Sequence, residues 1–144
     1  MSKLAATKAN RKDIQSLEGI VEKQQASIAN PSEFVACDMT FHSAIAAISR
    51  NTVCKVLSEA MLDWLFHFRR DLLRIPGSEI ITISEHRRIV AAIAAHDAEE
   101  AEKAMTEHLT RSDERYRILE DAMESRAQKI GGNGQVDQPP RMSL

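Results

Sequence analysis

Glycine and proline are scarce in this sequence, and most of them lie near its end. The 144 residues include five glycines and four prolines, of which three glycines and two prolines follow residue 130. Between Pro31 and Ile130 only Pro76 and Gly77 interrupt the chain. A sheet protein needs frequent turns and runs of β-branched residues, which are missing here. Together with 19 alanines, this scarcity predicts an all-α protein with a few long helices.

Cysteines, excess charge and long apolar runs are also lacking. Two cysteines do not make a disulfide framework, so we expect reduced thiols and a cytoplasmic protein. A formal net charge of −2 argues against a nucleic-acid footprint spread over the chain. No apolar run approaches the roughly 18 residues that a membrane span requires, and the first residues lack a signal-peptide core. The length fits one domain with a core of its own.

Helix start and stop signals divide the chain into helical segments that are joined by short connections. Four sets of residues each predict a helix start: Asn10 with Asp13, Asn30 with Pro31 and Glu33, Asn51, and Asp97 with Glu100. The start of the fifth segment is open between Glu79 and Ser84. The expected helices are 2–9, 11–28, 31–49, 52–74, 79 or 84–95 and 98–127, followed by a disordered tail over 131–144. Short connections between helices favour an antiparallel bundle.

Apolar residues at three- and four-residue spacing indicate which helix faces form the core. The 52–74 helix has an apolar face that we expect to be buried: Val53, Leu57, Met61, Leu65, Phe68 and Leu72. The faces of the other long helices are mixed: Phe34, Asp38, Phe41, His42, Ile45 and Ile48; His86, Ile89, Val90 and Ile93; Ala98, Ala101, Met105, His108 and Leu109.

Four polar residues on these faces, Asp38, His42, His86 and His108, point to a metal site. Asp38 and His42 are four residues apart and therefore share a helix face. A buried carboxylate needs a partner, and three imidazoles converging on it suit a divalent cation. This set of donors binds zinc, nickel, iron or manganese. The plain alternative for any one histidine is a hydrogen-bonded core residue, and for the whole set a buried polar network.

Other polar residues receive lesser roles. His67 lies off the main apolar face of its helix and His96 at a helix junction, so both are predicted non-ligands. Glu85 and Glu107 each precede a candidate ligand and are expected to point about 100° away from it. Without a general base, the chain is predicted not to be an enzyme, although a metal-dependent helical-bundle enzyme remains an alternative, as does an interaction module with a structural metal. Arg69 is a candidate for binding an anionic ligand.

Three segments of the sequence resemble one known family. They are D-M-T-F-H-S-A-I-A-A-I-S-R-N over 38–51, E-H-R-R-I-V-A-A-I-A-A-H-D over 85–97, and A-x-x-A-M-x-x-H-L over 101–109. They are similar to the FCD domain, the ligand-sensing domain of FadR-type GntR transcription regulators. The resemblance covers roughly residues 4–125, and Asp38, His42, His86 and His108 match the metal-ligand positions of the metal-binding members.

The resemblance implies six or seven antiparallel helices around a central cavity, with residues 1–130 as the sensing domain. It implies one divalent metal ion, zinc or nickel first, that anchors a small carboxylate effector, and a homodimer. Members contact DNA through a winged helix-turn-helix, and no segment of this sequence matches one. An excised domain, a truncated gene product and a natural stand-alone sensor are all open readings of that difference. The effector, the regulated genes and the choice between activation and repression are not encoded in any motif recognised here.

Overall fold

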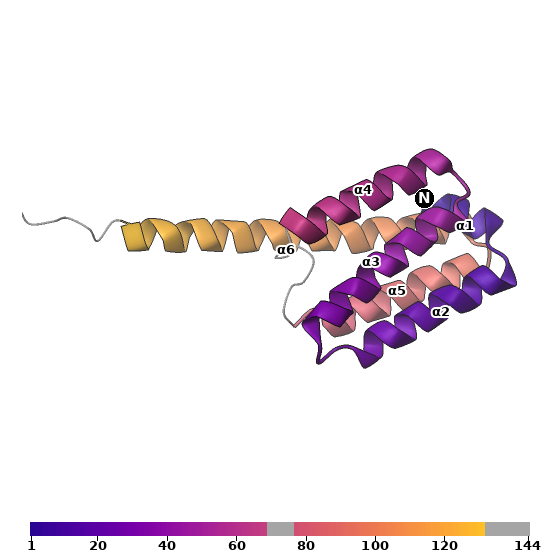
Figure 1. Ribbon diagram of the computed structural model, residues 1–144, viewed down its shortest axis with the longest axis horizontal. Helices are drawn as coiled ribbons and strands as arrows, with labels where there is room; N and C mark the ends of the chain where they lie inside the picture. The colour runs from indigo at the N-terminus through magenta and orange to yellow at the C-terminus, as the bar shows by residue number, and fades with distance from the viewer. Residues whose placement is uncertain (69–76, 132–144) are drawn as a thin grey trace, which may run out of the picture.

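The computed structural model describes residues 1–68 and 77–131, and these residues form six helices without a strand (Figure 1). The fold is therefore all-α, as the scarcity of turn residues predicts. The helices are α1 (Ser2–Lys8), α2 (Arg11–Ala26), α3 (Pro31–Ile48), α4 (Thr52–Phe68), α5 (Glu79–Ala94) and α6 (Ala98–Gly131). Within the described residues, none of these helices is both long and apolar enough to cross a membrane.

Polar caps fix where several helices begin. Asn10 Oδ1 accepts from the backbone N–H of Asp13, whose carboxylate accepts from the N–H of Asn10 in return, which is a complete capping box. Asn30 accepts from the N–H of Glu33 at the start of α3, and Asp97 does the same for α6 through Glu100. These caps occupy backbone donors that have no partner within the helix. The sequence-predicted starts are confirmed.

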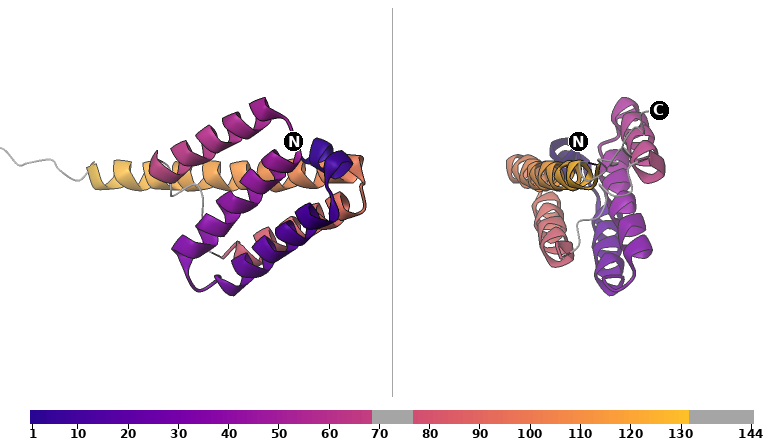
Figure 2. Two further views of the ribbon diagram at one scale, coloured as in Figure 1. Left: turned by 45° about the vertical axis from the view of Figure 1, so that its right-hand side comes forward. Right: turned by 90° about the vertical axis from the view of Figure 1, so that its left-hand side faces the viewer.

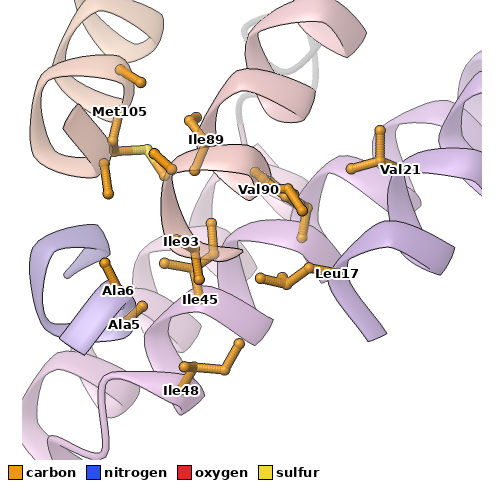
Figure 3. Close-up of a cluster of buried hydrophobic side chains, with 14 of the residues drawn as sticks. Ala5, Ala6, Leu17, Val21, Ile45, Ile48, Ile89, Val90, Ile93 and Met105 are labelled. Atoms are coloured by element: carbon orange, nitrogen blue, oxygen red, sulfur yellow. The ribbon is translucent and has the colours of Figure 1, made fainter. Parts of the chain in front are cut away.

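The helices pack around a core shared by α2, α3, α5 and the first part of α6. α2 packs on α3 and α5, α5 packs on α6, and short α1 lies against α3, α5 and α6 (Figure 2). α6 runs on past the other helices, so that only its first part belongs to the bundle (Figure 1). The core contains side chains from each of these elements, among them Ala5, Leu17, Ile45, Ile89, Ile93 and Met105 (Figure 3). The mixed faces predicted for the segments that form α3 and α5 are thus the ones that face the core.

The predicted burial of the apolar face of α4 is wrong. Val53, Leu57 and Met61 are 67%, 65% and 54% exposed, whereas Ser58 and Leu62 are buried. α4 packs on α3, the side of α4 that contains Ser58 and Leu62 is buried, and its more apolar face points outward. Periodicity finds an apolar face but does not say whether the same chain covers it.

Two further differences concern helix ends. α5 begins at Glu79, the earlier of the two predicted starts, and α6 continues to Gly131 rather than ending near residue 127. The predicted extension of the fourth helix to residue 74 and the predicted tail over 132–144 lie outside the described residues, as do the side chains of Leu65, Phe68 and Leu72.

Candidate metal centre

Three of the four predicted ligands, His42, His86 and His108, come together from three helices, and Asp38 lies beside two of them. Asp38 and His42 lie one turn apart on α3, His86 lies on α5, and His108 lies on α6. Each of the three histidines offers a ring nitrogen, and these atoms lie within 4.8 Å of one another. The Oδ2 atom of Asp38 lies 3.8 Å from His42 Nε2, and its Oδ1 atom lies 3.6 Å from His86 Nε2. The helical spacing and the bundle packing therefore create a compact cluster, called the histidine cluster below.

The histidine cluster is buried on the α5 and α6 side and less so on the α3 side. The side chain of His86 is fully buried and that of His108 is 5% exposed, whereas those of Asp38 and His42 are each 15% exposed. The ring of Phe41 stacks on His86 with ring centroids 4.0 Å apart, and the His42 and His108 rings are 5.3 Å apart. The imidazoles are thus held in place by packing, and solvent reaches the cluster at Asp38 and His42.

Gln24 of α2 is a member of this network that the sequence reasoning missed. Its side-chain amide donates to Asp38 Oδ1 at 3.1 Å, and its carbonyl oxygen lies 2.8 Å from His86 Nδ1. Gln24 is fully buried. It follows Leu17 and Val21 at helical spacing, so a polar residue on an otherwise apolar face was the signal that could have identified it.

Glu85 also contacts the cluster, and the expectation that it points away is wrong. Its Oε2 lies 2.8 Å from His108 Nδ1, and its two oxygens accept from Arg111 Nε and Nη2 at 2.5 and 2.6 Å. Burial raises the pKa of Glu85, but the hydrogen bonds from Arg111 and His108 outweigh that effect and leave the pKa below its ordinary value. Glu85 lies on α5 and contacts His108 on α6. The direction of its side chain relative to His86 on its own helix does not reveal this contact.

Burial keeps two of the imidazoles neutral. It lowers the pKa of His42, against an opposing pull from the Asp38 carboxylate and with help from His108. It lowers the pKa of His86 well below the usual value, with further lowering by His42, His108 and Arg111. A neutral imidazole is the form that coordinates a metal ion.

Hydrogen bonds at the outer nitrogens decide which ring atoms point inward. His108 Nδ1 meets the Glu85 carboxylate, which only accepts, so Nδ1 carries the proton. His86 Nδ1 meets the carbonyl oxygen of Gln24 and is a donor for the same reason. The Nε2 atoms of the two rings then face each other 3.4 Å apart. With both Nδ1 atoms donating outward, the two Nε2 atoms either share one proton or offer lone pairs to a cation, so the donor set fits a metal ion.

The remaining candidates lie outside the cluster. His67 bonds to Asp63 one turn earlier on α4, and His96 contacts the carbonyl oxygen of Ala6, in agreement with their prediction as non-ligands. Glu107 pairs with Arg88 on the surface rather than with a ligand. Arg69 lies outside the described residues.

A helical bundle with a polar cluster between α3, α5 and α6 is the architecture that the resemblance in the sequence implies. The chain belongs to the FCD domain family, whose family model matches residues 1–111. The resemblance to the FCD domain is therefore confirmed, while the metal-binding type stays a prediction.

Named relatives are bacterial transcription regulators of the GntR family. The chain is 31% identical over 110 residues to the HTH-type transcriptional repressor NanR of Cronobacter sakazakii, covering 73% of this chain and 41% of NanR. It is 30% identical over 116 residues to the Uxu operon regulator of Haemophilus influenzae, covering 76% and 43%. The chain therefore spans about two-fifths of the length of these curated relatives.

A solved structure shows the same fold at low sequence identity. E. coli McbR/YncC matches with a TM-score of 0.65 and 18% identity, covering 85% of this chain and 58% of that one. At this sequence identity the similarity supports the same helical fold and gives no information about a bound ligand.

Proposed function

We propose that this chain is the effector-sensing domain of a cytoplasmic GntR-type transcription regulator, and that it binds one divalent metal ion and a small organic acid. Asp38, His42, His86 and His108 would hold the ion. The observation that carries the proposal is the pair of inward Nε2 atoms of His86 and His108, 3.4 Å apart, with both outer nitrogens engaged. In the same family-based proposal, the domain forms a homodimer, and DNA is bound through a separate winged helix-turn-helix.

The chemistry of the donors supports zinc or nickel before manganese or iron. Three imidazoles are nitrogen ligands of intermediate softness, and Asp38 adds one anionic oxygen. When bound, the ion supplies a Lewis acid that attracts a carboxylate oxygen. The protein residues hold the donors in place, and the partial exposure of Asp38 and His42 leaves a side from which an effector reaches the cluster.

The geometry favours sensing over catalysis. A metal-dependent hydrolase needs a carboxylate or imidazole free to take a proton from water. Glu85 is the carboxylate next to the ligands, but both of its oxygens accept hydrogen bonds from Arg111 and one also bonds to His108. Glu85 therefore orients a ligand and is not available as a general base.

Elemental analysis by mass spectrometry of the untagged full chain tests the proposal. After loading with zinc or nickel and desalting, we expect close to one metal ion per chain. His42→Ala should lose most of the metal and remain folded, because His42 lies at the more exposed side of the cluster. His67→Ala is the matched control and should bind like the wild type, since the bonds that His67 makes with the described residues lie within α4.

The effector part has its own readout. Metal-loaded wild type should be stabilised by some organic acids in a thermal-shift screen, and the same acids should have no effect on metal-loaded His42→Ala. Wild-type protein that stays folded but retains no metal would refute the metal site. Equal stabilisation of both variants would refute an effector anchored by the metal.

A further inference from the structure

Gln24 occupies a special place behind the histidine cluster. It comes from α2, which contributes none of the four candidate ligands, and its side chain is completely buried. Both ends of its amide are used: the nitrogen contacts Asp38 Oδ1 and the oxygen contacts His86 Nδ1. A single neutral side chain thus touches a carboxylate ligand from α3 and an imidazole ligand from α5.

The orientation of this amide follows from its neighbours. A carboxylate oxygen only accepts hydrogen bonds, so the amide NH₂ group must face Asp38. The amide oxygen then faces His86 and can only accept, which requires the proton of His86 to lie on Nδ1. The lone pair of His86 Nε2 is thereby turned toward His108. The Asp38 carboxylate fixes the tautomer of His86 through Gln24, without touching its Nδ1.

We propose that Gln24 is a positioning residue that sets the tautomer of His86 and holds Oδ1 of Asp38, leaving Oδ2 as the oxygen free for a cation. The first half concerns the metal-free protein and stands alone. The second half rests on the metal site proposed above. In both halves of the proposal, Gln24 is not itself a ligand, but it determines which atom of His86 and which atom of Asp38 faces the metal site.

The neutrality of Gln24 matters because the other outer contact is charged. His108 Nδ1 donates to Glu85, whose negative charge is balanced by Arg111. Among the described residues, no arginine or lysine side chain bonds to Gln24, so a glutamate at that position would place an unbalanced carboxylate beside Asp38. An amide provides the acceptor that His86 needs and the donor that Asp38 needs, with no added charge.

NMR of the metal-free full chain tests the first half. Ring-nitrogen shifts of assigned histidines distinguish the two neutral tautomers, and His86 should be protonated on Nδ1 at neutral pH. Gln24→Met has nearly the same shape but neither amide group, and it should leave His86 in a mixture of tautomers. Gln24→Glu keeps an acceptor facing His86 Nδ1, so it should retain the Nδ1–H form even though its carboxylate lies unbalanced beside Asp38, and it is therefore the rescue variant. The neighbouring Gln25→Met is the matched control, because Gln25 lies on the surface and bonds to Arg87.

Competitive zinc titration tests the second half. Gln24→Met should bind zinc about 10- to 100-fold more weakly than wild type and Gln25→Met, the range usual for loss of a partner that orients a ligand. Wild-type His86 protonated on Nε2, or an unchanged tautomer in Gln24→Met, would overturn the positioning role. Equal zinc affinity in all variants would overturn the second half. If wild type binds no zinc, the metal site itself fails while the NMR result still decides the role of Gln24.

Discussion

Replacing Arg111 by methionine tests how firmly α6 is attached to α5 beside the histidine cluster. Arg111 approaches both oxygens of Glu85 at 2.5 and 2.6 Å and also donates to Thr82 Oγ1 at 3.3 Å. The two charged side chains are 22% and 23% exposed. Methionine keeps the aliphatic part of the side chain, so the change removes the charge and the hydrogen bonds rather than the packing.

The size of the effect follows from this geometry. Hydrogen bonds to charged groups contribute about 1.5–3 kcal/mol each, and partial exposure reduces that value. We therefore expect Arg111→Met to lower the free energy of unfolding by about 2 kcal/mol. For a domain of this size the melting temperature should fall by about 6–10 °C. The pKa of Glu85 should rise, since Arg111 supplies the strongest of the effects that lower it.

Urea and thermal unfolding of metal-free protein provide the assay, with Arg88→Met as the matched control. Arg88 also contacts two glutamates, Glu100 and Glu107, but it lies on the surface, where solvent screens such pairs, so its loss should change little. A double variant with Glu85→Gln should lose less than the sum of the single changes. Equal effects of Arg111→Met and Arg88→Met, or additivity with Glu85→Gln, would show that the buried pair is not what joins the helices.

Two further predictions concern pH and packing. The metal-free protein should lose stability as the pH falls below 6.5, the ordinary histidine pKa, because His42 and His86 take up protons in the unfolded chain more readily than in the folded protein. Urea unfolding of chelator-treated samples between about pH 5 and 8 should show this fall in the free energy of unfolding. A free energy of unfolding that does not change with pH would contradict the neutral, buried imidazoles. Ile45→Ala, in the core, should cost about 2–5 kcal/mol, and Leu57→Ala, on the exposed face of α4, less than about 0.5 kcal/mol. Similar losses for both in urea denaturation would place Leu57 in a packed environment instead.

Local patterns predicted the parts of this protein that depend on local physics. The capping residues Asn10, Asn30 and Asp97 act within three residues of themselves, so their effect is readable without a fold. The pairing of Asp38 with His42 follows from the helical repeat alone. That His86 and His108 would join them required either the packing of three helices or the family resemblance.

Contacts between helices escaped the sequence reasoning. Glu85 was assigned by the geometry of its own helix, yet its length lets it reach His108 across the α5–α6 interface. Gln24 offers only a polar position on an apolar face and Arg111 offers no motif, and both gain their roles when α2 and α6 pack beside α5. The prediction that the apolar face of α4 is buried was wrong for a related reason, since an apolar pattern does not show which surface covers it.

The uninterrupted length of α6 makes it a lever. The same helix carries His108 and Arg111 inside the bundle and continues to Gly131 without a break. At 1.5 Å per residue, the stretch after Arg111 extends for about 30 Å, so a tilt of about 5° at the bundle end displaces the tip by about 2.5 Å. A change of a few tenths of an ångström in the position of His108 is therefore enlarged several-fold at the far end of the helix. Distance measurements between labels near residue 131 and on α2 should detect this movement, because the displacement there is larger than the displacement at the histidine cluster.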